Sequence, residues 1–327
     1  MNMKLPRRQF LHLAAGAAAL PFAPDIACAQ AYPLRPVRIV AGFPAGSTTD
    51  VVARLIGQWL QERLGQAFIV ENRPGAGGTI ATEAAVRAFP DGYTLLLVST
   101  AHAINATLYN NLKFNILRDV APIAAVVNLP NVMVVNPSIS ARTVPEFVAY
   151  AKANSGKLNM SSAGNGSSSH LAGELFKAMT RVNLVHVPYR GQPAALTDLL
   201  GGQVDVSFGT TASSIEYIRA GNLRALAVTT ATRLEALPDV PALGEFVPGY
   251  EATTWGGLGA PRNTPAEVVE KLNKAINAGL ADTKFRANLT EIGGIPLGGS
   301  PADFGKLIAD ETEKWGKLVK LAGIKPE

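Results

Sequence analysis

Two segments of the chain share one design, in which a short apolar strand leads through a loop of small polar residues into an amphipathic helix. The strand, loop and helix start fall at 37–43, 44–50 and Val51 in the first segment, and at 158–161, 162–170 and Leu171 in the second. Backbone N–H groups at a helix start have no partner within the helix and lie at the positive end of its dipole, so such a loop binds an anion without Lys or Arg. The two loops lie about 120 residues apart and predict two lobes that hold one small anionic ligand.

The first thirty residues have the layout of an export signal. Basic residues, among them Arg7 and Arg8, precede an apolar stretch that is too short to span a membrane, and small residues follow at positions 27, 29 and 31. The arginine pair followed by Gln-Phe-Leu matches the twin-arginine type. We predict that residues 1–31 are a cleaved signal, cut after Ala29 or Ala31, and that the mature protein is periplasmic. The alternative is an amphipathic helix of the mature domain.

Cysteine and histidine content excludes several kinds of chemistry. The only cysteine, Cys28, lies in the predicted signal, so the mature chain has no disulfide and no reactive thiol. Lipid attachment at Cys28 is disfavoured because Asp25 stands where a lipoprotein signal has Leu. The mature chain has three histidines, His102, His170 and His186, and they show neither HxxxH nor HExxH spacing. We therefore expect no metal and no cofactor.

Length and charge narrow the class of protein further. Removing residues 1–29 takes away three of the 30 basic and one of the 25 acidic residues, which leaves a net charge near +3. The charges are scattered, without a basic stripe, so nucleic acid is not an expected partner. Roughly 300 mature residues exceed one comfortable core and favour two domains. No apolar stretch beyond the signal is long enough to span a membrane, so we expect a soluble mature protein.

Apolar strand segments alternate with amphipathic helix segments along the chain. One helix is expected at 145–153, opened by Thr143 and Pro145, and three helices are expected to close the chain after residue 264. This alternation predicts largely parallel sheets with helices on both faces. In such sheets ligands bind at the carboxyl ends of the strands. Small polar clusters follow the predicted strands at 46–49, 99–100, 162–169 and 209–211.

Several blocks of residues, in order and with ordinary spacing, carry a family resemblance. They lie at 32–50, 70–78, 90–96, 159–176, 186–205 and 220–229. Together they make the chain, from about Tyr32 to the C-terminus, similar to the solute receptors of tripartite tricarboxylate transporters, often called Bug proteins.

This resemblance implies an α/β, two-lobe periplasmic-binding-protein fold that is type II-like. Each lobe would hold a mostly parallel sheet flanked by helices, and two crossing strands would join the lobes. Lobe 1 would combine residues 32–131 and 252–327, and lobe 2 would be residues 132–251. The implied function is capture of a small carboxylate, either a dicarboxylate or an aromatic acid, in the cleft between the lobes. Such receptors deliver the ligand to a membrane permease of one large and one small subunit, and we expect a monomer.

The family's carboxylate-holding loop maps onto 43–50, and the opposing loop maps onto 163–170. A carboxylate at Asp50 would repel an anionic ligand, so its expected task is to orient loop N–H groups. Position 209 departs from the family pattern, because many relatives have Phe-Asp where this chain has Phe208-Gly209. The missing carboxylate disfavours an amino-acid ligand. The expected ligand-binding residues are Phe43, Ala45, Gly46, Ser47, Thr48, Thr49, Asp50, Ser99, His102, Ala163, Gly164, Gly166, Ser167, Ser168, His170, Tyr189, Gly209 and Thr210.

Several of these residues also have a purely structural interpretation. The loop glycines can serve only to supply a positive φ, and His102 and His170 can be hydrogen-bonded core residues. For Tyr189 two alternatives stay open, with its hydroxyl in the cleft or outside it. Arg190 is expected at the solvated surface. Trp255 is expected to pack at the second crossing rather than to contact ligand.

Motifs that would indicate catalysis are absent from the sequence. Ile80 occupies the third glycine position of a GxGxxG loop, and neither GxxxxGK[ST] nor GxSxG occurs. Ser167 and His170 lie three residues apart without an evident orienting acid. We therefore predict a receptor and not an enzyme. The alternatives are a ligand-sensing partner of a membrane sensor kinase and a small-molecule hydrolase.

Overall fold

A mixed sheet runs through the described part of the protein, with its strands in the order β2–β1–β3–β9–β4–β7–β5–β6 and with β8 and β10 paired to β4. The structure is a computed structural model that describes residues 32–324 apart from 110 and 322, and the chain from Arg35 onward forms one compact unit. The predicted export signal lies outside the described residues. No helix in the described part of the chain is both long and apolar enough to cross a membrane.

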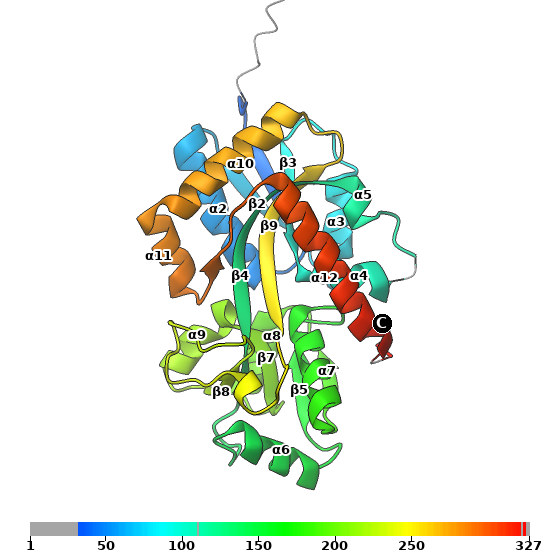
Figure 1. Ribbon diagram of the computed structural model, residues 1–327, viewed down its shortest axis with the longest axis vertical. Coiled ribbons are helices and arrows are strands. Elements are labelled where there is room, and N and C mark those ends of the chain that lie inside the picture. Colours follow the sequence, from blue (N-terminus) through cyan, green and yellow to red (C-terminus); the bar gives the residue numbers. More distant parts are fainter. Residues whose placement is uncertain (1–31, 110, 322, 325–327) are drawn as a thin grey trace, which may run out of the picture. The chain divides into compact units, whose positions relative to one another are not determined.

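One side of the molecule is built on three parallel strands that alternate with helices (Figure 1). These strands, together with β9, β10 and part of β4, form what we term sheet A. All three strands are short. Strands β1 and β3 are almost fully buried, as expected where helices cover both faces, whereas β2 at the edge of the sheet is largely half-buried. The elements are β1 (Val37–Ala41), α2 (Thr48–Leu64), β2 (Phe68–Asn72), η1 (Ala76–Gly78), α3 (Thr79–Val86), β3 (Thr94–Ser99), α4 (Thr100–Leu108) and α5 (Ile116–Asp119).

The other side repeats this arrangement around β5, which pairs in parallel with β6 and β7. These strands, with β8 and the rest of β4, form what we term sheet B. The predicted helix after Thr143 is present as α6, and the Thr143 side chain accepts a hydrogen bond from the Glu146 amide. The elements are α6 (Val144–Ala153), β5 (Asn159–Ser162), α7 (Ser168–Thr180), β6 (Val185–Pro188), α8 (Gln192–Leu200), β7 (Val206–Thr210), α9 (Thr211–Arg219), β8 (Arg224–Val228) and η2 (Leu243–Glu245).

Two long strands connect sheets A and B, and they lie side by side in Figure 1. Strand β4 (Val120–Val135) pairs with β9 (Thr253–Pro261) as far as Pro130, and from Asn131 it pairs with β7 and β8. Because β4 takes the chain from sheet A to sheet B and β9 brings it back, both run antiparallel to their neighbours. The expectation of mostly parallel sheets therefore holds for β1–β3 and β5–β7 and not for the pairs made by the crossing strands.

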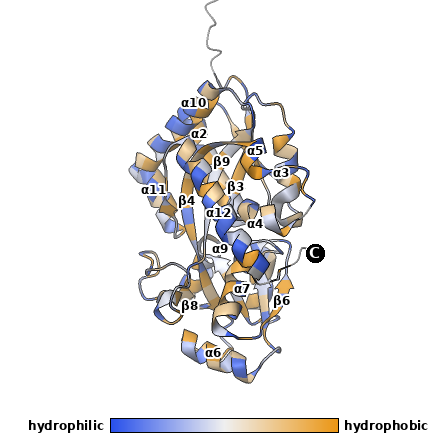
Figure 2. Ribbon diagram, turned by 45° about the vertical axis from the view of Figure 1, so that its right-hand side comes forward, coloured by the Kyte–Doolittle hydropathy of each residue, from blue (hydrophilic) through white to orange (hydrophobic). Residues whose placement is uncertain are grey.

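Three helices close the chain and cover sheet A. They are α10 (Ala266–Ala281), α11 (Thr283–Glu291) and α12 (Pro301–Leu321), with β10 (Ile295–Pro296) between the last two. Helix α10 buries Val268, Leu272 and Ile276 at a spacing of four residues, and hydrophilic residues alternate with this stripe in Figure 2. Helix α12 approaches β9 so closely that a Cβ at Gly257 would overlap Phe304. Glycine in the crossing strand thus permits the packing of α12.

Candidate functional site

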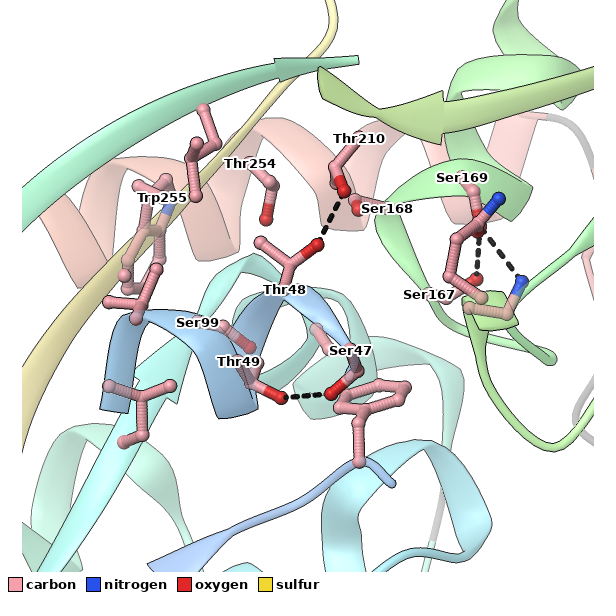
Figure 3. Close-up of a pocket in the computed structure, with 18 residues that line it drawn as sticks. Ser47, Thr48, Thr49, Ser99, Ser167, Ser168, Ser169, Thr210, Thr254 and Trp255 are labelled. Atoms are coloured by element: carbon pink, nitrogen blue, oxygen red, sulfur yellow. Dashed lines mark hydrogen bonds between the residues drawn. The ribbon is translucent and has the colours of Figure 1, made fainter. Parts of the chain in front are cut away.

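A cavity of about 50 Å³ lies at the carboxyl ends of the strands, where α2, α4, α7, α8 and α9 begin (Figure 3). We term it the inner cavity. Hydroxyl side chains dominate one part of its lining, and none of the described residues that line it is charged. Val52, Leu97, Leu129 and Trp255 form an apolar part of the wall. The hydroxyl-bearing residues are Ser47, Thr48, Thr49, Ser99, Ser167, Ser168, Ser169, Thr210 and Thr254.

The start of α2 is held by a short network within the first anion loop. Ser47 caps the helix with φ −74° and ψ 162°, and its Oγ accepts from the Asp50 amide at 3.4 Å. The same Oγ lies 3.1 Å from Oγ1 of Thr49. Gly46, with φ +76°, donates its N–H to Oδ2 of Asp50 at 2.9 Å. A serine cap and a side-chain acceptor at the third helical position commonly accept hydrogen bonds from the unpaired N–H groups at a helix start.

The start of α7 repeats this network in the second loop. Ser167 caps the helix with φ −78° and ψ 159°, and its Oγ accepts from the His170 amide at 3.3 Å. The same Oγ lies 3.0 Å from Oγ of Ser169. Gly166, with φ +75°, donates its N–H to Nδ1 of His170 at 3.3 Å. The sequences Gly46–Asp50 and Gly166–His170 thus build one local structure twice, with Asp and His as equivalent acceptors.

The repeated structure leaves the next amides of both helices available. The N–H groups of Thr48, Thr49, Ser168 and Ser169 make no hydrogen bond to another described residue, and these residues line the inner cavity. Amides in the first helical turn point along the helix axis and carry the positive end of the dipole. The cavity can therefore hold a carboxylate by charge-assisted hydrogen bonds from backbone groups.

A hydroxyl contact joins the two sides of the cavity. Thr48 on α2 and Thr210 at the end of β7 point toward one another and share a short hydrogen bond (Figure 3). Thr210 also contacts Oγ of Ser213 at 2.7 Å. Since Thr48 follows sheet A and Thr210 belongs to sheet B, this contact exists only while the two sides are close together.

Asp50 faces its own loop rather than the inner cavity. Burial alone would raise the pKa of this carboxyl, but hydrogen bonds from Arg54, Gly46 and Asn72 hold the pKa below its usual value. Arg54 Nη2 lies 2.9 Å from Oδ1 of Asp50. Asp50 is therefore ionised and its Oδ2 accepts hydrogen bonds within its own loop and helix, which matches the expected role of orienting a loop N–H.

The three described histidines are neutral groups, of which His102 and His170 are buried and His186 is half-buried. Burial lowers the pKa of His102 to about 4, and its Nδ1 accepts from the Ser99 amide at 3.0 Å, which closes the start of α4. Burial, with a contribution from His186, lowers the pKa of His170 to about 3. The His170 and His186 rings stack at 3.9 Å, and His186 Nε2 lies 2.6 Å from Oγ of Ser162.

This geometry gives no support to Ser167 and His170 as a catalytic pair. The His170 Nδ1 atom is taken by the Gly166 amide, and the Ser167 hydroxyl donates to the Gly164 carbonyl oxygen at 2.6 Å. Among the described residues, no group of three or more His, Cys, Asp and Glu side chains is arranged to hold a metal ion.

The structure places half of the expected ligand-binding residues at the inner cavity, and the other half do not line it. Tyr189 and Gly164 line a second cavity, and the Tyr189 hydroxyl donates to Oδ2 of Asp198 at 2.6 Å. The residues at the inner cavity are Phe43, Ser47, Thr48, Thr49, Ser99, Ala163, Ser167, Ser168 and Thr210. Those that do not line it are Ala45, Gly46, Asp50, His102, Gly164, Gly166, His170, Tyr189 and Gly209.

The side chain of Gln192 occupies the space beside Gly209 that a larger residue at position 209 would need. A Cβ at Gly209 would lie 2.7 Å from Nε2 of Gln192 and 2.7 Å from Oγ of Ser214. The Gln192 amide is buried, lines the inner cavity and donates to Oγ of Ser207 at 3.2 Å. An amide from α8 therefore lies close to where a side chain at position 209 would begin.

Sequence reasoning also missed the wall of the cavity. Val52, Leu97 and Leu129 occur in ordinary apolar patterns and carry no local sign of facing a cavity. Ser169 belongs to the polar cluster at 162–169. Ser167, two residues before it, is among the expected ligand-binding residues, and both line the cavity. Trp255 lines the cavity and also packs against Phe304, with its ring nitrogen donating to Glu311 at 3.1 Å.

Comparison with known proteins gives consistent matches over most of the chain. Residues 52–324 match the family model described as tripartite tricarboxylate transporter family receptor. The UPF0065 protein in the tcbD–tcbE intergenic region of Pseudomonas sp. (strain P51) is 38% identical over 292 residues, covering 89% of this chain and 87% of that protein. Protein BugT of Bordetella pertussis is 35% identical over 300 residues, covering 91% and 92%.

Solved structures agree with these matches. Rpa4515 of R. palustris with adipate has a TM-score of 0.88 and 38% identity, covering 90% of this chain and all of that one. The periplasmic binding protein BugD has a TM-score of 0.86 and 36% identity, with the same coverage. MatC from Rhodopseudomonas palustris with bound malate has a TM-score of 0.83 and 32% identity, covering 88% and 100%.

Proposed function

The chain belongs to the tripartite tricarboxylate transporter receptor family, and on this basis we propose that it captures a small carboxylate in the inner cavity and delivers it to a membrane permease of one large and one small subunit. The family consists of solute-binding receptors and not of enzymes. The ligands of two solved relatives, adipate and malate, are both dicarboxylates.

One observation carries the proposal: two helix starts with the same cap geometry meet at a cavity without charged side chains. Backbone N–H groups of α2 and α7 supply the positive potential, and hydroxyl groups add further donors. The apolar wall of Val52, Leu97 and Leu129 suits the carbon skeleton. The lining has no acidic side chain to pair with an ammonium group, which favours a dicarboxylate or aromatic acid over an amino acid.

We further propose two lobes, 32–131 with 252–327 and 132–251, that close on the ligand. The change of β4 partner between Pro130 and Asn131, and the start of β9 at Thr253, support these boundaries. The inner cavity volume of about 50 Å³ equals about four water-sized positions. A dicarboxylate needs more room, so entry requires separation of Thr48 from Thr210. Small-angle scattering would show a smaller radius of gyration with saturating ligand, and an unchanged radius would contradict closure.

Periplasmic location through a cleaved twin-arginine signal completes the proposal. Its support is the arginine pair at Arg7 and Arg8 and the family's periplasmic members.

Glycine substitutions in the two loops test the binding site. Gly46 has φ +76°, and a Cβ there would meet only Cγ of Pro193 at an ordinary contact distance of 3.7 Å, so Gly46→Val distorts the loop mainly through backbone strain. Gly164 has φ +113°, and a Cβ there would lie 2.9 Å from the Tyr189 carbonyl oxygen. We expect both variants to lose carboxylate binding in calorimetric titration while the fold is kept.

Gly65→Val is the matched control. Gly65 has φ +73° at the far end of α2 with no neighbouring atom within 4 Å, so this variant carries similar strain away from the cavity. It should lose stability and keep its affinity. Unchanged affinity in both Gly46→Val and Gly164→Val would refute the two-loop site.

A further inference from the structure

A second and larger cavity adjoins the inner one. It has a volume of about 490 Å³, and Phe43 and Ala163 line both cavities. Its other lining residues are Pro44, Tyr109 and residues of the loops at 74–78, 164–165 and 189–190, so both sides of the molecule contribute to it. We term it the outer cavity.

The backbone of these loops keeps the outer cavity open. Residues 75–78 all have positive φ, which suits glycine at three of the four positions. A Cβ at Gly77 would lie 2.8 Å from Nδ2 of Asn105 and 3.1 Å from the Asn165 carbonyl oxygen. The loop at 74–78 therefore comes close to the loop at 163–165 without sending side chains between them.

The lining of the outer cavity is mostly apolar and includes one positive charge. Pro44, Pro74, Tyr109 and Tyr189 are among the lining residues, and no acidic side chain is among the described ones. Arg190 is the charged member. Its guanidinium makes no ion pair or hydrogen bond within the described part of the chain, whereas arginines such as Arg54 and Arg73 are paired with carboxylates.

We propose that the outer cavity is a second ligand subsite, which takes the distal acid group of a dicarboxylate too long for the inner cavity. The first carboxylate binds the helix starts of α2 and α7, the carbon skeleton passes Phe43 and Ala163, and the second carboxylate pairs with Arg190. This assignment rests on the proposed function. The apolar lining favours a straight-chain or aromatic skeleton, and Arg190 suits a planar carboxylate.

A chain-length series of ligands tests the assignment. Calorimetric titration of the purified protein would use straight-chain α,ω-dicarboxylates from malonate to suberate, each with the monocarboxylate of the same carbon number. In the unaltered protein, affinity should rise with chain length for the diacids and exceed that of the matched monoacids once the second acid reaches Arg190.

Two variants separate charge from space. Arg190→Gln should weaken the long diacids about threefold to fivefold, as expected for an exposed ion pair, and leave the monoacids unchanged. Pro74→Phe enlarges a lining side chain of the outer cavity outside both anion loops and should weaken the long diacids more than tenfold while malonate is unaffected. Arg142→Gln is the charge-matched control, because Arg142 is exposed, lines neither cavity and has no ion pair among the described residues.

The outcomes distinguish the two proposals. If Arg190→Gln weakens all acids equally and to the same extent as Arg142→Gln, the second subsite is refuted and only general attraction remains. Long diacids that bind Pro74→Phe as tightly as the unaltered protein refute it as well. If no carboxylate of any length binds the unaltered protein, the proposed function itself fails.

Discussion

Replacing Asp50 tests whether this carboxylate supports the loop rather than the ligand. In Asp50→Ala, the Gly46 N–H loses its acceptor at 2.9 Å and Arg54 loses its partner. In Asp50→Asn, the side-chain oxygen can still accept from Gly46, but the charge is gone. The two variants therefore separate the acceptor from the charge.

The magnitude follows from three contributions. A hydrogen bond to a charged acceptor is worth about 1.5–3 kcal/mol, and a carboxylate in the first turn of a helix adds about 0.3–1 kcal/mol. The Arg54 side chain is 57% exposed, so solvent screening limits its ion pair to about 0–1 kcal/mol. We expect Asp50→Ala to lower the free energy of unfolding by about 2–5 kcal/mol, and Asp50→Asn by about 1 kcal/mol.

The effect of Asp50 depends on pH in a defined direction. Its folded-state pKa lies below the value of 3.8 expected for the unfolded chain. The stabilisation by the ionised carboxylate is therefore complete above the unfolded value and is lost as the pH falls through the folded value. This component of acid destabilisation should be missing from both variants.

Urea unfolding followed by tryptophan fluorescence provides the assay, because Trp59 lies on α2 itself. Glu83→Ala is the control, since Glu83 pairs with Arg87 at 2.7 Å four residues away and should cost less than about 1 kcal/mol. Carboxylate affinity should fall in Asp50→Ala and hold or improve in Asp50→Asn, where a negative charge near the ligand is removed. Equal loss of affinity in the two variants would refute the argument.

Three further predictions concern other parts of the chain. Gly209→Asp should lower the thermal midpoint and weaken carboxylate binding because its Cβ meets the Gln192 amide, and adding Gln192→Ala should restore stability in a thermal-shift assay. Burial, with Lys177 nearby, lowers the pKa of His186 to about 4, so the unfolded chain takes up its proton first; stability should fall from pH 6.5 to about pH 4, and less steeply in His186→Gln, as measured by urea unfolding. Arg7→Lys with Arg8→Lys should keep the precursor in the cytoplasm on cell fractionation, and a normal periplasmic yield would show that the arginine pair is not needed.

Much of the fold could be predicted because its cues are local. The family and the α/β class inferred from the sequence are confirmed by the family match and the solved relatives. The two anion loops were evident because a strand, a glycine-containing loop and a helix are adjacent in sequence. The equivalence of Asp50 and His170 was not evident, since a carboxylate and an imidazole look unrelated until both accept from the preceding glycine.

The rest of the site depends on contacts between distant segments. Gln192 opens α8, and only the register of β7 brings it against Gly209. Leu97 and Leu129 lie in strands whose burial pattern is continuous, so no alternation marks the face that meets the cavity. The antiparallel pairs of β4 and β9 arise from the path of the chain and not from residue preference.

The long strand β4 also constrains the order in which the protein can be made. Its pairing with β9 joins residues up to about 140 positions apart, and β9 also pairs with β3 in the interior of sheet A. Until residues 253–261 leave the ribosome, the edges of β3 and β4 have no partner, and unpaired strand edges favour aggregation. Sheet B contains only the end of β4 and strands β5 to β8, which follow one another in the chain. It can therefore form while synthesis continues. The side of the protein that is synthesised first is therefore the last to be completed.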